Sequence, residues 1–191
     1  MKTIETKSFK IAVSLLFIFA LATNTYAQSE NNAKAKNTVE KPQIDMLSAI
    51  ISGNLEMVKQ HINAGTDINK KDQMSGSTPL ITAATFGKTD IVKVLIDANA
   101  ELDIKNNEGS TALHAAAFFC RVEIVQLLIR AGADKTIQNN HAATPWQSVI
   151  GPFSEMKPIY EMIQKQLEPL GLKLDLKEIE MTRPMIAILL Q

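Results

Sequence analysis

Apolar residues recur at helical spacing in short blocks along the middle of the chain. Residues 91–96 (IVKVLI) and 124–129 (IVQLLI) each place a broad apolar stripe on one face of a predicted helix. Each block follows a segment with small residues, such as Ala83-Ala84, which let a neighbouring helix approach closely. Polar segments such as residues 98–109 separate the blocks and are predicted to turn back as extended fingers. The pattern predicts an all-α fold made of paired short helices.

The helix pairs repeat at a fixed period. Three triplets lie 33 residues apart: Thr78-Pro-Leu80, Thr111-Ala-Leu113 and Thr144-Pro-Trp146. An earlier, weaker copy fits at a spacing of 34 residues, with Glu56-Met-Val58 in place of Asp90-Ile-Val92. A fixed period of this length indicates stacked repeats, because one copy alone cannot bury both faces of its helices.

Two consecutive segments resemble ankyrin repeats: STPLITAATFGKTDIVKVLIDANAELDIKNNEG and STALHAAAFFCRVEIVQLLIRAGADKTIQNNHA. The shared features are T-P-L-H-x-A-A, a helix-stop glycine, E-I-V, L-L and G-A-D. Three positions depart from the family pattern: Ile81 stands where the motif has His, Asn99 replaces Gly, and Cys120 occupies the helix-stop Gly. The resemblance implies an ankyrin-repeat solenoid of about four helix-turn-helix repeats with a helical C-terminal cap.

The period sets the expected domain limits. The predicted segments are a signal peptide at 1–27, a flexible linker at 28–42, repeats at 43–76, 77–109 and 110–142, the start of a divergent fourth repeat at 143–150, and the rest of that repeat with a C-terminal cap at 151–191. In the cap, the spacing predicts an amphipathic helix that ends before Pro169 and another that begins at Thr182-x-Pro184, after a candidate capping box at Asp175. The alternative role for these helices is docking to a partner.

The first segment has the layout of a secretory signal peptide. A basic start precedes an apolar run over residues 11–22, and Thr25-Tyr-Ala27 places small residues before a cut after Ala27. A membrane anchor is the alternative, but the 12 residues of the run, at about 1.5 Å each, fall short of a hydrocarbon core of about 30 Å. We therefore expect export, to the periplasm or as a secreted protein, and no membrane contact after cleavage.

Composition narrows the chemistry. The 20 Lys and Arg residues balance 20 Asp and Glu residues, which argues against a nucleic-acid partner. One cysteine and three histidines exclude a cysteine-rich zinc site and disfavour a multi-histidine metal centre. We predict no catalytic, cofactor-binding or metal-binding residues. The ankyrin resemblance assigns His114 to hydrogen bonds within and between repeats, whereas His61 and His141 are expected to face solvent.

The ankyrin resemblance also predicts where a partner binds, because family members contact partners with the concave surface and the finger tips. The corresponding concave positions are Thr85, Phe86, Phe118 and Phe119, and the tips are Gln73, Met74, Asn107, Glu108, Asn140 and His141. Exposed rings at Phe86 and Phe118 are expected to anchor a partner. Packing between repeats is the alternative, in which Phe86 and Phe119 stack on each other.

The predicted function is therefore non-catalytic binding of an unidentified protein outside the cytoplasm, with a monomer favoured. One alternative is an inhibitor or accessory subunit of an exported enzyme. The other is a thiol-dependent enzyme, for which Cys120 is the one available cysteine nucleophile.

Overall fold

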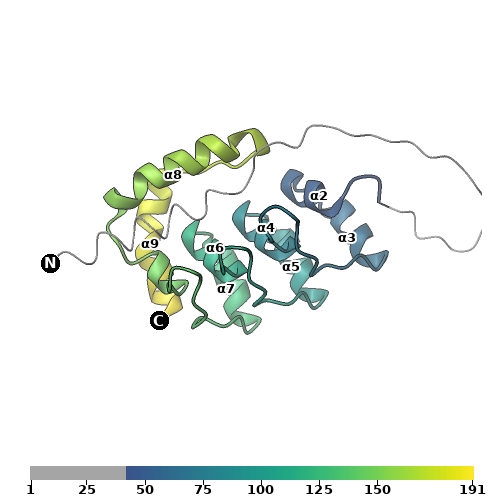
Figure 1. The fold of residues 1–191 in the computed structure, drawn as a ribbon, viewed down its shortest axis with the longest axis horizontal. Coiled ribbons are helices and arrows are strands. Elements are labelled where there is room, and N and C mark those ends of the chain that lie inside the picture. The colour runs from purple at the N-terminus through teal and green to yellow at the C-terminus, as the bar shows by residue number, and fades with distance from the viewer. Residues whose placement is uncertain (1–41) are drawn as a thin grey trace, which may run out of the picture.

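The computed structural model describes residues 42–191, and every regular element in that range is an α-helix or a 3-10 helix (Figure 1). The all-α prediction is confirmed. The predicted signal peptide and all but the last residue of the predicted linker lie outside the described residues. Within the described range, no helix combines the length and the apolar character that crossing a membrane requires.

Three helix pairs stack side by side in two rows. The pairs are α2 (Met46–Ser52) with α3 (Leu55–Asn63), α4 (Pro79–Thr85) with α5 (Thr89–Asp97), and α6 (Ala112–Phe118) with α7 (Val122–Arg130). The inner row is α2, α4 and α6, the outer row is α3, α5 and α7, and each helix contacts the next one in its row. A finger loop joins each outer helix to the next inner helix, as the period predicts.

Residues at the helix ends explain where the helices begin and end. Thr78 caps α4 by accepting a hydrogen bond from the Ile81 amide (3.3 Å), and Pro79 takes the first helical position, where a proline loses no hydrogen bond. After α4, Gly87 adopts the left-handed conformation with a φ of +66°. Cys120 holds the same position after α6 with a φ of +52°, so this turn is kept by a residue other than glycine.

Small and aliphatic residues share the core of the stack. Ala83 and Ala84 of α4 and residues 115–117 of α6 are buried, so the backbones of these two inner helices approach closely. Leu95 and Leu128 of the outer helices fill the space between the two rows and are fully buried. Burial of one such leucine contributes roughly 2 kcal/mol, and the same contact recurs from one layer to the next.

The fourth layer of the stack is built differently. Its elements are η2 (Trp146–Ser148), α8 (Phe153–Leu167), η3 (Glu168–Leu170) and α9 (Leu176–Leu190). The short η2 extends the inner row beside α6, α9 extends the outer row beside α7, and η2 and α9 contact each other. The inner and outer elements of this layer are therefore η2 and α9, and residues 152–175 are inserted between them.

The last helix begins earlier than the sequence pattern predicts. The Asp175 carboxylate accepts hydrogen bonds from two backbone amides, at 2.9 and 3.0 Å, and this cap starts α9 at Leu176. The predicted start at Thr182 is wrong. The helix continues through Pro184, which has no amide N–H to donate to the Glu180 carbonyl. Both residues lie on the exposed face of α9, so water can bind this carbonyl instead.

Candidate binding surface

In each finger loop, the side-chain oxygens of one Asp or Asn residue accept hydrogen bonds from backbone amides of the same loop. The Asp72 carboxylate accepts hydrogen bonds from backbone amides two, three and five residues ahead of it, at 2.7 to 2.8 Å. Asn106 and Asn139, in the next two fingers, accept from the amides two and four residues ahead. Burial raises the pKa of Asp72, but the hydrogen bonds from the Ser75 hydroxyl and from these amides outweigh it and hold the pKa below its ordinary value. The conformation of each finger is therefore fixed locally.

Hydrogen bonds also tie each finger tip to the next. Asn107 donates from its backbone amide to the Ser75 carbonyl (2.9 Å) and from its side chain to the Met74 carbonyl (3.0 Å). Asn140 repeats both bonds one finger later, to the carbonyls of Glu108 (3.0 Å) and Asn107 (2.9 Å). The three tips therefore form one continuous row, which we call the tip row.

The tip row requires glycine where one finger lies against the next. Gly109 has a φ of +72°, and a Cβ atom there would lie 2.8 Å from the Asn140 amide nitrogen. Gly76 faces Asn107 in the same way in the finger before it. Ala142 takes this position in the last finger with a φ of +54° and is exposed. The methyl group fits there because η2, rather than another finger, follows in the described fold.

The structure brings all six predicted tip residues into this row. Four of them are exposed, namely Gln73, Met74, Asn107 and Asn140. Glu108 and His141 are half-buried side by side, with 3.8 Å between Oε2 and Nε2, so the expectation that His141 faces solvent is wrong. The asparagine side chains bind neighbouring fingers, which leaves Gln73 and the 47% exposed Met74 as the tip side chains that project into solvent.

The predicted concave positions are covered by α8. Phe118 and Phe119 are only 1% and 3% exposed, so the expectation that the Phe118 ring faces solvent is wrong. The cause is Tyr160 of α8, whose ring centroid lies 4.9 Å from that of Phe118. Phe86 is half-buried against the same apolar cluster, and Thr85 is half-buried at the end of α4. Partner binding by these four residues stays a prediction.

A buried arginine holds α8 in place. The Tyr160 hydroxyl donates to the Phe118 carbonyl (2.7 Å) and accepts from Arg183 Nη1 of α9 (3.0 Å). Arg183 Nη2 donates to the Gly151 carbonyl (3.0 Å), and this side chain is 3% exposed. Burial raises the pKa of Tyr160, so the phenol keeps its proton and remains a donor. Sequence reasoning missed Arg183, whose signal was a charged residue at a core position of an apolar helical spacing.

His114 has the role that the sequence analysis gave it. Its Nδ1 accepts a hydrogen bond from the Thr111 amide (3.2 Å), and its Nε2 faces the Ala143 carbonyl at 3.0 Å and donates to it. The first bond lies within the repeat and the second reaches the following finger. Burial lowers the pKa of His114 to about 4, so the ring is neutral at pH 7.

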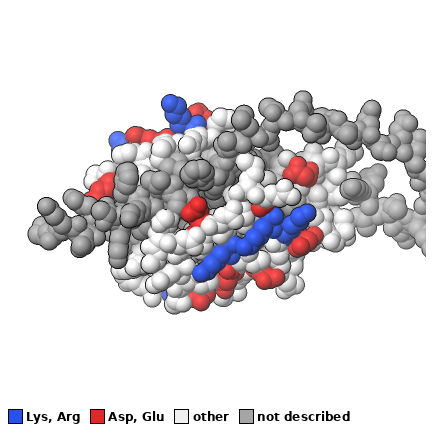
Figure 2. Space-filling model, viewed as in Figure 1, with Lys and Arg blue, Asp and Glu red and all other residues white. Residues whose placement is uncertain are grey.

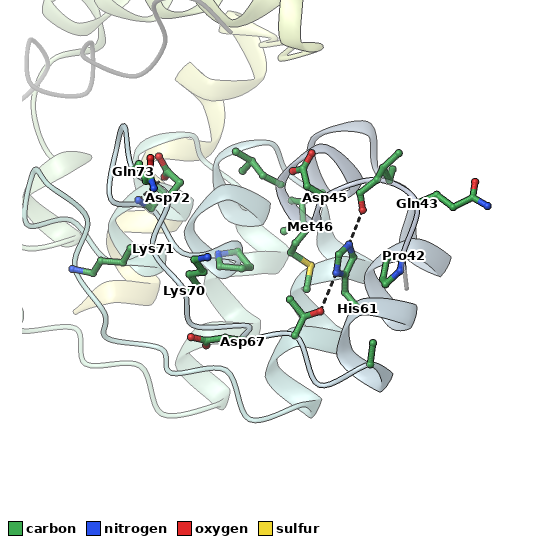
Figure 3. Close-up of a pocket in the computed structure, with 17 residues that line it drawn as sticks. Pro42, Gln43, Asp45, Met46, His61, Asp67, Lys70, Lys71, Asp72 and Gln73 are labelled. Carbon is green, nitrogen blue, oxygen red and sulfur yellow. Dashed lines mark hydrogen bonds between the residues drawn. The ribbon is translucent and has the colours of Figure 1, made fainter. Parts of the chain in front are cut away.

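His61 bridges two segments at the start of the stack, where Figure 3 shows its two hydrogen bonds. Its Nε2 lies 2.8 Å from the Ile44 carbonyl and its Nδ1 lies 3.0 Å from Thr66 Oγ1. The ring is 8% exposed, so the expectation that it faces solvent is wrong. A groove of about 790 Å³ opens beside it, between α2 and the first finger, with Asp67 and Lys70 on its rim.

The described residues carry little that resembles catalytic chemistry. Within residues 42–191 no three His, Cys, Asp or Glu side chains gather as a metal site would need. Burial raises the pKa of the Cys120 thiol, whereas a nucleophilic cysteine needs a lowered one. Figure 2 shows Lys and Arg side chains in a narrow band flanked by acidic side chains, without a broad patch of one sign on that face. This face therefore lacks the broad basic patch that binding a polyanion would need.

Comparison with known proteins identifies the stack. Residues 46–139 match a family described as ankyrin repeats, in three copies. The chain belongs to the ankyrin-repeat family. A solved structure of the ankyrin repeat domain of Bcl-3, a member of the IkappaB protein family, is similar at 27% identity with a TM-score of 0.53. That match covers 62% of this chain and 50% of the Bcl-3 chain, and ankyrin repeats generally mediate protein–protein interaction.

Two curated relatives match a shorter part of the chain. They are protein phosphatase 1 regulatory subunit 27 of Homo sapiens and of Mus musculus, each 43% identical over 60 residues. The match covers 31% of this chain and 38% of each relative. The similarity is therefore confined to less than half of the relatives' own length.

Proposed function

We propose that the chain is an exported, non-catalytic protein-binding module that recognises its partner with the tip row and with the adjoining concave face. The observation that supports this most directly is the hydrogen-bonded tip row itself. Because Asn107 and Asn140 fix the three tips before an encounter, little conformational entropy is lost when a partner docks.

Within the tip row, the first finger offers the side chains best placed for contact. Gln73 and Met74 are exposed, and neither side chain takes part in the hydrogen bonds that shape the finger. A methionine is flexible and polarisable, so it adapts to an apolar surface on a partner. Glu108 and His141, half-buried further along the row, add charge and hydrogen-bonding capacity at the edge of this contact.

A capture experiment tests the tip row. The purified full-length chain serves as bait for the exported fraction, beside a double variant Gln73→Ala, Met74→Ala. We expect the double variant to retain at least tenfold less partner, with a thermal midpoint within about 2 °C of the parent, because exposed side chains contribute little to stability. Gln60→Ala, an exposed change on α3, is the matched control and should capture normally. Undiminished capture by the double variant would show that the tips are not the binding surface.

Export is the second part of the proposal and is supported by the sequence of residues 1–27, which lie outside the described residues. N-terminal sequencing of the protein recovered from the periplasm or the medium tests it. The expected first residue is Gln28. A chain recovered from the cytoplasm with Met1 in place contradicts export and leaves the binding role to be tested separately.

A second candidate function is regulation of an enzyme, as an inhibitor or accessory subunit of an exported enzyme. The specific support is the 43% identity to proteins named as regulatory subunits of a phosphatase. Once a partner has been captured, its catalytic rate is measured with and without the full-length chain. A changed rate supports the regulatory role, whereas an unchanged rate would show that the chain binds the partner without regulating it.

A further inference from the structure

The helix α8 lies outside the regular stack and across part of its concave face (Figure 1). We propose that α8 occupies a partner site on this face, and that the partner which this site takes is an amphipathic helix that replaces α8. The inference rests on the proposed function, since it assumes that the chain binds a protein. It adds which surface is used, what covers it, and what kind of segment fits.

The first observation is the independence of α8 from the stack. The fourth layer is completed by η2 against α6 and by α9 against α7, so the repeats are closed without α8. The buried residues of α8 belong to an apolar cluster that is separate from the core of the stack. Phe118 and Phe119 are the residues of the repeats that this second cluster buries.

The second observation is the pattern by which the concave face binds α8. Its buried residues follow the spacing i, i+3, i+4, i+7 and i+11, and they are Met156, Ile159, Tyr160, Ile163 and Leu167. Glu161 and Lys165 lie on the opposite, exposed face of the helix. This one-sided pattern is how an amphipathic helix lies in a groove. The same pattern therefore describes a helix that takes the place of α8.

The third observation is that hydrogen bonds hold the middle of α8 but not its C-terminal end. At Tyr160, one hydroxyl links the Phe118 carbonyl to Arg183. Within the described range, no hydrogen bond or ion pair joins residues 161–167 to the repeats, so this end is held by apolar contact. Segments held by few contacts open at a lower free energy than the core.

Beneath that end of the helix the fit is incomplete. A crevice of about 20 Å³ lies beneath Ile163 and Leu167. The repeats line it with both apolar and polar residues, among them Ile81, Ala115, Phe119, Ser77, Asn106 and Ser110. A second crevice of about 20 Å³ lies where Leu167 meets Thr85 and Phe86 and continues to Leu47 of α2. Each crevice has room for about one water molecule, so the apolar side chains at this end of α8 lack some of the contacts that close packing would give them.

Because α8 is covalently connected to the stack, it competes with any partner for the concave face. A tethered segment competes at an effective concentration on the order of millimolar. A free helix with the same residues should therefore bind the parent chain weakly, and should bind well once α8 itself is weakened. This difference gives a test that needs no knowledge of the natural partner.

The test uses a fluorescent peptide of residues 152–168 and the full-length chain. The release variant carries Ile163→Ser and Leu167→Ser in α8 and leaves the concave face unchanged. We expect the peptide to bind the release variant at least tenfold more tightly than the parent chain. A peptide with the same two serines should bind neither chain. The control variant Lys165→Ala, on the exposed face of α8, should behave like the parent.

The second measurement is hydrogen exchange of the parent chain, which tests the proposal even if the release variant does not fold. Amides of residues 161–167 should exchange at least tenfold faster than those of α6 under native conditions. Equal protection of the two segments would overturn the proposal, as would equally weak peptide binding to parent and folded release variant. Neither result touches capture through the tip row, so failure here and failure of the proposed function are distinguishable.

Discussion

The repeat stack and the α8 insertion solve the same packing problem in opposite ways. In the stack, α4 and α6 meet through alanines, and α5 and α7 bury Leu95 and Leu128 at equivalent positions, so each contact is made again one layer later. In the insertion, every contact is made once, and the Tyr160 hydroxyl supplies the hydrogen bonds that join α8 to α6 and α9. Because the stack repeats its contacts, it can be predicted from the periodic pattern of one sequence. A contact that is made once produces no such pattern.

The two regions also bury polar groups differently. The stack uses neutral, local groups, such as His114 and Asn106, each satisfied by the backbone of its own or the adjacent repeat. The insertion relies on Arg183, a buried cation whose hydrogen bonds go to the Tyr160 hydroxyl and a carbonyl. Burying a charge costs more than burying a neutral group. The insertion is therefore the region whose attachment is easier to disturb.

Truncating one leucine in each region should give the largest difference in stability between the stack and the insertion. Leu113→Ala, at a fully buried position of α6, is expected to lower the free energy of unfolding by about 4 kcal/mol, because fixed neighbours leave a cavity. Leu167→Ala in α8 should cost about 2 kcal/mol, because the helix end already lies over crevices and can settle. Urea unfolding followed by circular dichroism measures both. Equal losses would place α8 in the same packing unit as the stack.

Acid should weaken the stack through His114. Burial holds the folded pKa of His114 near 4, against an ordinary value of 6.5, so between these values the unfolded chain binds a proton that the folded chain does not. The contribution to stability is complete above pH 6.5 and is lost as the pH falls towards 4, by about 3 kcal/mol in all.

Urea unfolding at pH 7 and pH 4.5 checks this, with His114→Gln as the control. Glutamine at this position preserves the capping box with Thr111 but does not titrate. The parent chain should therefore lose more stability over this pH range than the variant. The same loss in both proteins would show that another group carries the acid sensitivity.

One substitution, glycine to alanine, tests how tightly each region is packed around a left-handed residue. Gly109→Ala in the tip row should cost about 3 kcal/mol, because the new methyl group adds a clash with the Asn140 amide to the backbone strain. Gly171→Ala, after η3 in the insertion, should cost about 1 kcal/mol, because nothing lies within 4 Å of the new Cβ. Thermal unfolding of the two variants provides the comparison, and a reversed order would contradict the described packing of the tips.

The smallest expected effect is a gain at the end of the tip row. Ala142→Gly removes the strain of a left-handed alanine and loses almost no packing, since the residue is exposed. The net gain is about 0.5 kcal/mol, because glycine also loses more backbone entropy on folding. Differential scanning calorimetry should detect a slightly higher midpoint. Ala142→Ser keeps a Cβ in the left-handed conformation, so it should show no gain.

Much of the fold was predictable because local chemistry and the 33-residue period agree. Thr78 with Pro79 marks a helix start, and Cys120 falls where a helix must stop; both are confirmed. The role of His114, taken from the ankyrin resemblance, is confirmed as well. The candidate site was predictable only in part. The tip residues do come together, whereas Phe118 and Phe119 are buried, because the sequence did not reveal that α8 covers them.

The sequence by itself determined the paired helices, their stacking order and the turns between them, because each depends on residues close in the chain and is repeated. Tertiary structure alone decided the placement of α8 and the burial of Arg183 and of His61. These depend on partners far apart in the chain, such as Tyr160 and Phe118, 42 residues apart, whose encounter is fixed by folding rather than by local preference.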